Sequence, residues 1–220
     1  MSGSEEERSR GTLKPDAAGP RTKSERTRRR ILDAAARTFR EQGYAATRLA
    51  DIAAAADTRA GSLYYHFDSK EQLLSEVLER GHSSVAGTVR ARVAALGPKA
   101  RYRDRLRTAI RAHLEGILRH DDYAAANIHL HDQIPAAIRR RHIRKHRAYA
   151  AYWQNLLAGA QAAGEIRTDV DVSMARLNLF GMMNWSIEWY RPGRLGIEEL
   201  AANVFRILFD GIAAREAPPD

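Results

Sequence analysis

The side chains best suited to chemistry in this sequence lie between Gly43 and Leu74, in the segment GYAATRLADIAAAADTRAGSLYYHFDSKEQLL. Glycine and serine at positions 61 and 62 are small enough to let a helix approach a surface closely. Arginines precede this pair, and two tyrosines, a histidine and a lysine follow it within the same segment. All of these side chains donate hydrogen bonds to phosphate oxygens. These residue types indicate an interface with a nucleic acid.

Two short helices joined by a tight turn are needed to position these side chains. Apolar spacing predicts a first helix from Thr22 to Gly43, a second over residues 48–56 capped by Thr47, and a third over residues 59–66. This order is the helix-turn-helix arrangement, in which the last of the three helices enters the major groove. We expect DNA contacts from Thr47, Arg48, Arg59, Ala60, Gly61, Ser62, Tyr64, Tyr65, His66 and Lys70.

Some of these side chains have an alternative interpretation. Tyr64 and Phe67 have the helical spacing of core aromatic residues, and we predict that Phe67 is buried, whereas DNA contact is favoured for Tyr65 and His66. A cluster of arginines in the first helix is either a solvated face or a row of phosphate contacts. The sequence leaves both possibilities open for Arg26, Arg28, Arg29 and Arg30.

The same segment resembles the TetR family of one-component bacterial regulators. The resemblance is carried by Gly43-Tyr44, Thr47, Ile52-Ala53, Gly61, Leu63-Tyr64-Tyr65-His66-Phe67 and Lys70-Glu71-x-Leu73. It implies a homodimer, usually a repressor, that binds double-stranded operator DNA and releases it when a small molecule enters a C-terminal domain.

The turn between the two short helices departs from the family pattern, which commonly has Gly-Val-Ser where this chain has Asp57-Thr58-Arg59. Aspartate tolerates left-handed backbone, so the turn remains compatible with this sequence. We expect Asp57 or Thr58 to cap the third helix. Arg59 gains reach to phosphate or guanine, and we expect it to alter operator preference.

The rest of the chain continues as helices. Ser69 or Asp68 can cap a fourth helix that runs to about Leu96, in which Gly81 and Gly87 permit either a bend or close packing. Further helices are predicted over residues 102–120, 123–131, 135–163, 172–190 and 197–214. The prediction is an all-α fold of about nine helices, with a disordered arm (1–21), a DNA-binding domain (22–70) and a ligand-binding and dimerisation domain (71–215).

Composition narrows the function classes. The chain has no cysteine, which excludes disulfides and thiolate metal sites, and it has no phosphate-binding glycine loop, HExxH sequence or nucleophile elbow. We therefore expect neither an enzyme nor a cofactor. The longest run without a charge is 148–164, too short and too polar for a membrane span. With no signal sequence apparent, a cytoplasmic protein with no membrane partner is expected.

The positive charge is concentrated in the middle of the chain. The net charge is +9, and residues 81–160 carry 15 Lys and Arg against 5 Asp and Glu. General attraction to DNA is one explanation, and a sequence-nonspecific nucleic-acid-binding protein is the corresponding alternative function. An anionic effector is the other explanation, with the phosphates of an acyl-CoA thioester as the sharpest case.

A second resemblance supports the thioester. The segment from Asn184 to Gly193 is similar to the acyl-CoA-sensing branch of the TetR family, which implies ligand contacts at Trp185, Trp189 and Arg191. The two tryptophans are four residues apart and share a helix face, where they could wall an acyl group or, equally well, belong to the core or the dimer interface. An uncharged lipophilic compound is the alternative effector.

Two predictions concern the C-terminal half. The last two helices present more apolar residues than one side of a small domain needs, so we expect them to form a dimer surface: Leu179, Met182, Met183, Ile187, Leu200, Val204, Ile207, Leu208 and Ile212. His142 and His146 have a spacing that can bind a metal, but their neighbours are basic. We therefore favour a solvated basic face over a metal site.

Overall fold

The computed structural model describes residues 22–119, 122–130 and 132–212, and within these ranges the chain forms nine α-helices and no strand. The predicted all-α fold is confirmed. The arm predicted for residues 1–21 and the last eight residues lie outside the described ranges. The helices are α1 (Lys23–Ala46), α2 (Leu49–Ala55), α3 (Ala60–His66), α4 (Lys70–Ala95), α5 (Tyr102–Leu118), α6 (Asp122–His129), α7 (Ala136–Ala162), α8 (Val172–Trp189) and α9 (Ile197–Ile212).

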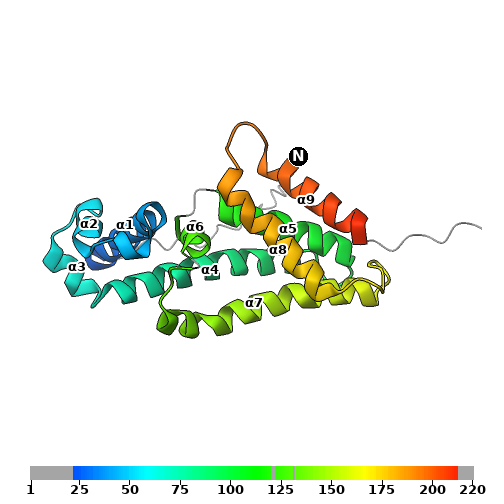
Figure 1. The fold of residues 1–220 in the computed structure, drawn as a ribbon, viewed down its shortest axis with the longest axis horizontal. Coiled ribbons are helices and arrows are strands. Elements are labelled where there is room, and N and C mark those ends of the chain that lie inside the picture. Colours follow the sequence, from blue (N-terminus) through cyan, green and yellow to red (C-terminus); the bar gives the residue numbers. More distant parts are fainter. Residues whose placement is uncertain (1–21, 120–121, 131, 213–220) are drawn as a thin grey trace, which may run out of the picture.

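The two ends of the molecule have separate apolar cores, and α4 contributes to both. In Figure 1, α1, α2 and α3 form one end, whereas α5, α7, α8 and α9 lie around the far part of α4. Between these groups, α6 contacts both α1 and α4. The core at the end formed by α1, α2 and α3 also includes Leu73, Leu74, Val77 and Leu78 of α4. This core therefore extends past residue 70, where the sequence suggests a domain boundary.

The link between α1 and α2 corrects one prediction. Thr47 does not cap α2: the residue at that position is Arg48, which makes no side-chain cap hydrogen bond. The Thr47 hydroxyl instead donates to the carbonyl of Gly43 at 2.7 Å. Gly43 has a φ of 76°, which interrupts the helical ladder and leaves that carbonyl in need of a donor.

The turn between α2 and α3 confirms one prediction from the sequence and corrects another. Asp57 adopts left-handed backbone with a φ of 47°, as predicted. Neither Asp57 nor Thr58 caps α3, because the N-cap residue is Arg59 and it makes no side-chain cap bond. The Asp57 carbonyl accepts from Arg30 Nη2 at 2.6 Å, so an arginine of α1 holds the turn.

The start and middle of α4 fix its position. The Ser69 side chain accepts a hydrogen bond from Gln72 N, which confirms it as the cap of this helix. A Cβ atom at Gly81 would lie 2.2 Å from the carbonyl oxygen of Tyr123, whereas one at Gly87 would meet nothing within 4 Å. For Gly81 the structure therefore supports close packing of α4 against α6.

Candidate functional site

The exposed face of α3 carries most of the residues predicted to contact DNA. Tyr64 is 57% exposed and Tyr65 is 80% exposed, although large aromatic side chains normally avoid water. Phe67 is fully buried, as predicted, and Leu63 is buried beside it. Also exposed are Arg48, Arg59, Ala60 and Gly61, while Ser62 and His66 are half-buried. We call the exposed and half-buried members of this set the reader: Arg48, Arg59, Ala60, Gly61, Ser62, Tyr64, Tyr65 and His66.

Two of the predicted DNA contacts have structural partners inside the protein. Thr47 is buried, and its side chain bonds to Gly43 as described above. The ammonium group of Lys70 donates to the carbonyls of Tyr44 and Thr47, each at 2.9 Å, and lies 4.3 Å from the Tyr44 ring centroid. Lys70 therefore connects the start of α4 to the link between α1 and α2. Because α3 lies between α2 and α4 in the chain, this connection helps to position α3.

The arginine cluster of α1 divides into paired and unpaired members. Arg28 pairs with Glu76 at 2.5 Å, and Arg30 holds the turn before α3. Arg29 lies 3.9 Å from Asp33. Arg26 is exposed and makes no ion pair with any residue that the structure describes, so within this cluster it is the best candidate for a phosphate contact.

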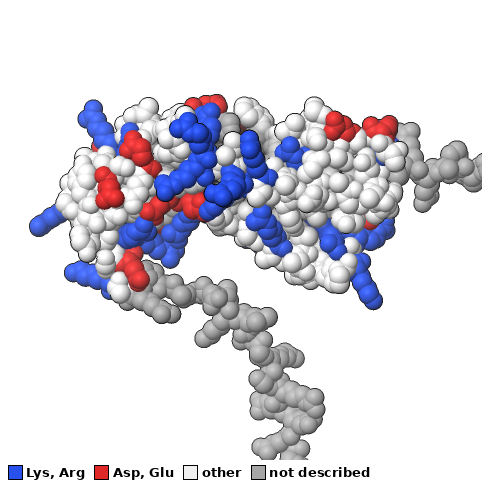
Figure 2. Space-filling model, turned by 90° about the horizontal axis from the view of Figure 1, so that it is seen from below, with Lys and Arg blue, Asp and Glu red and all other residues white. Residues whose placement is uncertain are grey.

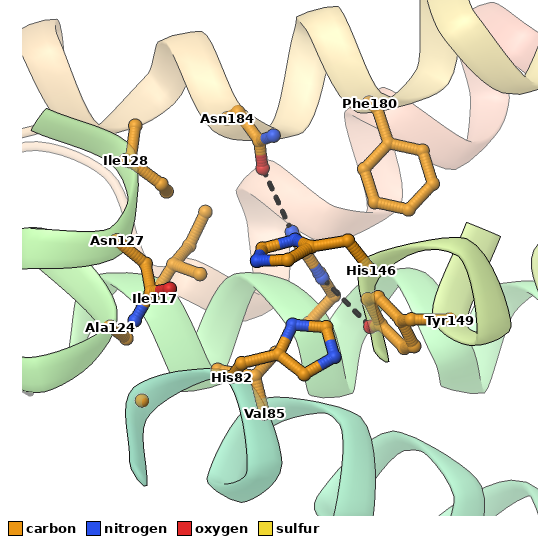
Figure 3. Close-up of a pocket in the computed structure, with 12 residues that line it drawn as sticks. His82, Val85, Ile117, Ala124, Asn127, Ile128, His146, Tyr149, Phe180 and Asn184 are labelled. Atoms are coloured by element: carbon orange, nitrogen blue, oxygen red, sulfur yellow. Dashed lines mark hydrogen bonds between the residues drawn. The ribbon is translucent and has the colours of Figure 1, made fainter. Parts of the chain in front are cut away.

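A cavity of about 340 Å³ lies in the C-terminal half, between α4, α5, α6, α7 and α8. Figure 3 shows its lining side chains converging from these helices. Its size falls within the range of roughly 300–1,000 Å³ that small-molecule sites occupy. It is lined by Gly81, His82, Val85, His113, Ile117, Ala124, Asn127, Ile128, His146, Tyr149, Phe180 and Asn184.

One wall of this cavity is a chain of hydrogen bonds through His113. Its Nδ1 lies 3.0 Å from the Tyr149 hydroxyl and its Nε2 lies 3.1 Å from Asn184 Oδ1 (Figure 3). Since a carbonyl oxygen only accepts, Nε2 carries the proton and Nδ1 accepts from the tyrosine. Burial lowers the pKa of His113 to about 4, so this ring is neutral at pH 7. The wall is therefore polar and uncharged.

Two further histidines stand at the cavity, and His146 is itself exposed, which places it at the mouth. The rings of His82 and His146 lie 4.5 Å apart between centroids, and burial lowers the pKa of His82. His142 is buried and lies 3.0 Å from Ser75 Oγ, so the predicted solvated face is wrong for that residue. No group of three metal-binding side chains occurs among the described residues.

Matches to family models cover most of both halves of the chain. The model described as "Bacterial regulatory proteins, tetR family" matches residues 31–77, and the model described as "Tetracyclin repressor-like, C-terminal domain" matches residues 99–212. The chain belongs to the TetR family. It is therefore a DNA-binding transcriptional regulator and not an enzyme.

Named relatives of this TetR-family chain are similar over most of their length. The HTH-type transcriptional repressor KstR2 of Rhodococcus jostii (strain RHA1) is 30% identical over 193 residues, which is 85% of this chain and 91% of that protein. AibR in complex with isovaleryl coenzyme A and operator DNA is 29% identical with a TM-score of 0.76, covering 83% of this chain and 98% of AibR. KstR2 of Mycobacterium tuberculosis is 26% identical with a TM-score of 0.76, covering 86% and 95%.

The tryptophans predicted to contact the ligand of this TetR-family protein lie outside the main cavity. Trp185 is 67% exposed and Trp189 is 49% exposed, and neither lines the cavity. Their helix instead contributes Phe180 and Asn184 to the cavity wall. Arg191 lines a separate, smaller cavity. Spacing placed the two tryptophans on one helix face, but that face is turned away from the main cavity.

The predicted dimer surface is also corrected in part. Leu179, Met183, Leu200, Val204 and Leu208 are buried within the single chain, so these residues belong to its own core. Ile207 of the predicted set is exposed, and further exposed apolar side chains lie along one stripe of α8. They are Met174, Leu177, Trp185 and Trp189.

Several basic residues in the 81–160 segment, whose charge the sequence explains by DNA attraction or an anionic effector, already have partners in this TetR-family chain. Arg105 donates to main-chain carbonyls of the turn after α4, Arg111 bonds to Glu115, and Lys145 pairs with Glu79. On α7, exposed arginines that make no ion pair with a described residue stand at positions 140, 141, 144 and 147. No helix within the described ranges has the length and apolarity that crossing a bilayer requires.

Proposed function

We propose that this protein is a homodimeric repressor that binds a near-palindromic operator and releases it when an acyl-CoA thioester enters the main cavity. One observation carries the proposal: α4 and α6, which form two walls of the cavity, also contact α1 beneath the reader. A ligand that changes the spacing of these walls therefore acts on the reader. The AibR complex with isovaleryl coenzyme A and operator DNA supports a thioester as the ligand.

In this proposal α3 enters the major groove of the operator. Arg59, Ala60, Gly61 and Ser62 stand at its N-terminal end, where a recognition helix meets base edges. Tyr64, Tyr65, His66, Arg48, Thr47 and Lys70 are assigned to the phosphate backbone or to the support of α3. Two readers related by a two-fold axis would contact half-sites roughly 34–36 Å apart.

The cavity suits the acyl part of a thioester. Val85, Ile117, Ile128 and Phe180 supply apolar walls, which favour burial of hydrocarbon. The exposed His146 marks the mouth, and α7 continues from it with the arginines described above. Figure 2 shows basic side chains gathered in the middle of the face on which α7 lies. We assign the phosphates of the effector to this basic face.

The connection to the reader runs through α6 and the link that follows it. Asn127 lines the cavity, and its Nδ2 donates to the carbonyl of Leu78 in α4 at 3.0 Å. Gln133 Oε1 accepts from the backbone N–H of Tyr44 at 2.9 Å. Movement of α6 on ligand binding would therefore change both contacts, and the effector releases DNA only if it binds the DNA-incompetent arrangement more tightly.

The dimer is assigned to the exposed apolar stripe of α8 together with α9. Large apolar side chains at Trp185 and Trp189 are what an interface between two copies would cover. Analytical ultracentrifugation tests this part directly. We expect a dimer at micromolar concentration, and a monomer that still binds the operator would contradict it.

The experiment that tests the effector is a titration of thioesters against the protein–operator complex, followed by fluorescence anisotropy of labelled DNA. We expect acyl-CoA esters to release the operator, with the free acid and free CoA much weaker. If no thioester acts and an uncharged lipophile releases the operator instead, the acyl-CoA part of the proposal is wrong. Binding that is the same for operator and scrambled DNA would contradict the repressor itself.

A further inference from the structure

A second cavity of about 260 Å³ lies at the junction between the reader end and the C-terminal half. Its walls come from α1, α5, α6 and the end of α8, and it shares Ile117 with the main cavity. Basic and imidazole side chains enter it from three different elements: Arg40 from α1, His129 from α6 and Arg191 just after α8. Among the described residues, none of those that line this cavity is acidic.

The three side chains differ in how much of their hydrogen-bonding capacity is used. Arg191 donates through Nη1 to the carbonyls of Glu188 and Tyr190, and with the described residues it makes no other hydrogen bond and no ion pair. Its Nε and Nη2 remain to bind an oxyanion. His129 Nδ1 lies 3.5 Å from Glu188 Oε1, which leaves Nε2 on the other side of the ring.

Arg40 is the member of the set that belongs to the DNA-binding half. Its guanidinium contacts Asp122 at 3.1 Å and Glu41 at 3.0 Å. Asp122 has a second cationic partner, Arg37, at 3.7 Å. Arg40 can therefore turn toward an anion in the cavity while Asp122 keeps a partner, which lowers the cost of the exchange.

We propose that this second cavity binds a single carboxylate or phosphate group between Arg191 and Arg40, with His129 as an additional contact. Paired guanidinium groups are well suited to carboxylate and phosphate oxygens because they donate several hydrogen bonds in one plane. A bound anion would join the end of α8 to α1. It would thereby link the C-terminal half directly to the helix that supports the reader.

The anion has two possible sources with the same chemistry. It is either a free ion, or a charged group at the far end of the effector's acyl chain, because Ile117 borders both cavities. The second source rests on the proposed acyl-CoA function, whereas the first does not. The experiment therefore includes one arm for each source.

The first arm measures binding of inorganic phosphate by calorimetry to the wild-type protein, Arg191→Gln and Arg194→Gln. Arg194 is exposed in the same turn and does not line the cavity, so it is a matched control. If the anion is a free ion, phosphate binds the wild type and Arg194→Gln equally. Arg191→Gln then weakens it about tenfold, as expected for loss of a hydrogen bond between charged groups.

The second arm compares glutaryl-CoA with valeryl-CoA, which have equal chain length, in releasing the operator. If the anion belongs to the effector, the terminal carboxylate lowers the concentration needed, and Arg191→Gln removes that advantage while Arg194→Gln retains it. The inference is overturned if Arg191→Gln and Arg194→Gln behave alike in both arms. If no thioester releases the operator but phosphate binding depends on Arg191, the acyl-CoA proposal fails and the anion site stands.

Discussion

The hydroxyl of Tyr123 donates a 2.6 Å hydrogen bond to Asp33 Oδ1, which joins α6 to α1. Burial and this bond both raise the pKa of the tyrosine, so it stays protonated as a donor. Residues that follow Tyr123 on α6 line the main cavity: Ala124, Asn127 and Ile128. One short helix therefore touches both the proposed effector and the helix beneath the reader.

Tyr123→Phe should weaken the coupling between effector and DNA. Removing the hydroxyl costs about 1 kcal/mol of stability and loosens α6 from α1. We expect the ratio of operator dissociation constants with and without thioester to fall below the wild-type ratio. Tyr152→Phe, which deletes a hydroxyl with no hydrogen bond to a described residue, is the control. A ratio that Tyr123→Phe leaves unchanged would show that coupling takes another route.

Substitutions on α3 should separate base reading from phosphate binding. Arg59→Ser should relax sequence preference at one operator position, by about 1–3 kcal/mol, because an arginine at this end of the helix is placed to reach a base. Tyr65→Ala should weaken all sequences alike. Binding to a panel of single-base operator variants distinguishes these effects, and unchanged preference in Arg59→Ser would refute its assignment.

The two glycines of α4 should respond in opposite ways to alanine. A methyl group at Gly81 would meet the Tyr123 carbonyl at 2.2 Å, so Gly81→Ala must push α4 and α6 apart and destabilise the fold. Gly87→Ala enters open space in a helix and should stabilise it by about 0.5–1 kcal/mol. Urea denaturation of both variants measures the difference. Equal effects would contradict the close approach of α4 and α6.

The buried His113 should make stability depend on pH. Its pKa is lowered to about 4 in the folded protein, so the unfolded chain binds a proton between pH 6.5 and 4 that the folded protein does not. Stability should therefore fall as the pH falls through this window, by about 2 kcal/mol between pH 6.5 and pH 5. His113→Gln should lose this part of the dependence. Parallel denaturation profiles for the variant and the wild type would show that the ring titrates normally.

The sequence predicted the helices well because their apolar periodicity is local. The burial of Phe67 and the Ser69 cap follow from residues only a few positions away, and both predictions are confirmed. The role of Lys70 could not be predicted in this way, since its partners Tyr44 and Thr47 lie on the far side of α2 and α3 in the sequence.

The cavity was harder to predict because its walls come from five helices. In the sequence His113 lies two residues after Arg111 and two before Glu115, and only the packing of α5 against α7 and α8 makes it a buried wall residue. The spacing of Trp185 and Trp189 predicts that both side chains lie on one face of the helix. It does not predict which part of the molecule that face contacts. The signal that could have identified the wall is polar residues, such as Asn184, on the inward side of an otherwise apolar helix.

The central claim is that a thioester in the main cavity releases the operator, and a cavity-filling variant tests it most directly. Ile128 lines the cavity, whereas Ile143 is 41% exposed on α7, so Ile128→Trp and Ile143→Trp make the same change inside and outside the site. Operator anisotropy is measured for both variants and the wild type as acyl-CoA is added. We predict that all three bind the operator and that only Ile128→Trp resists release. Release of all three at the same thioester concentration would contradict the claim.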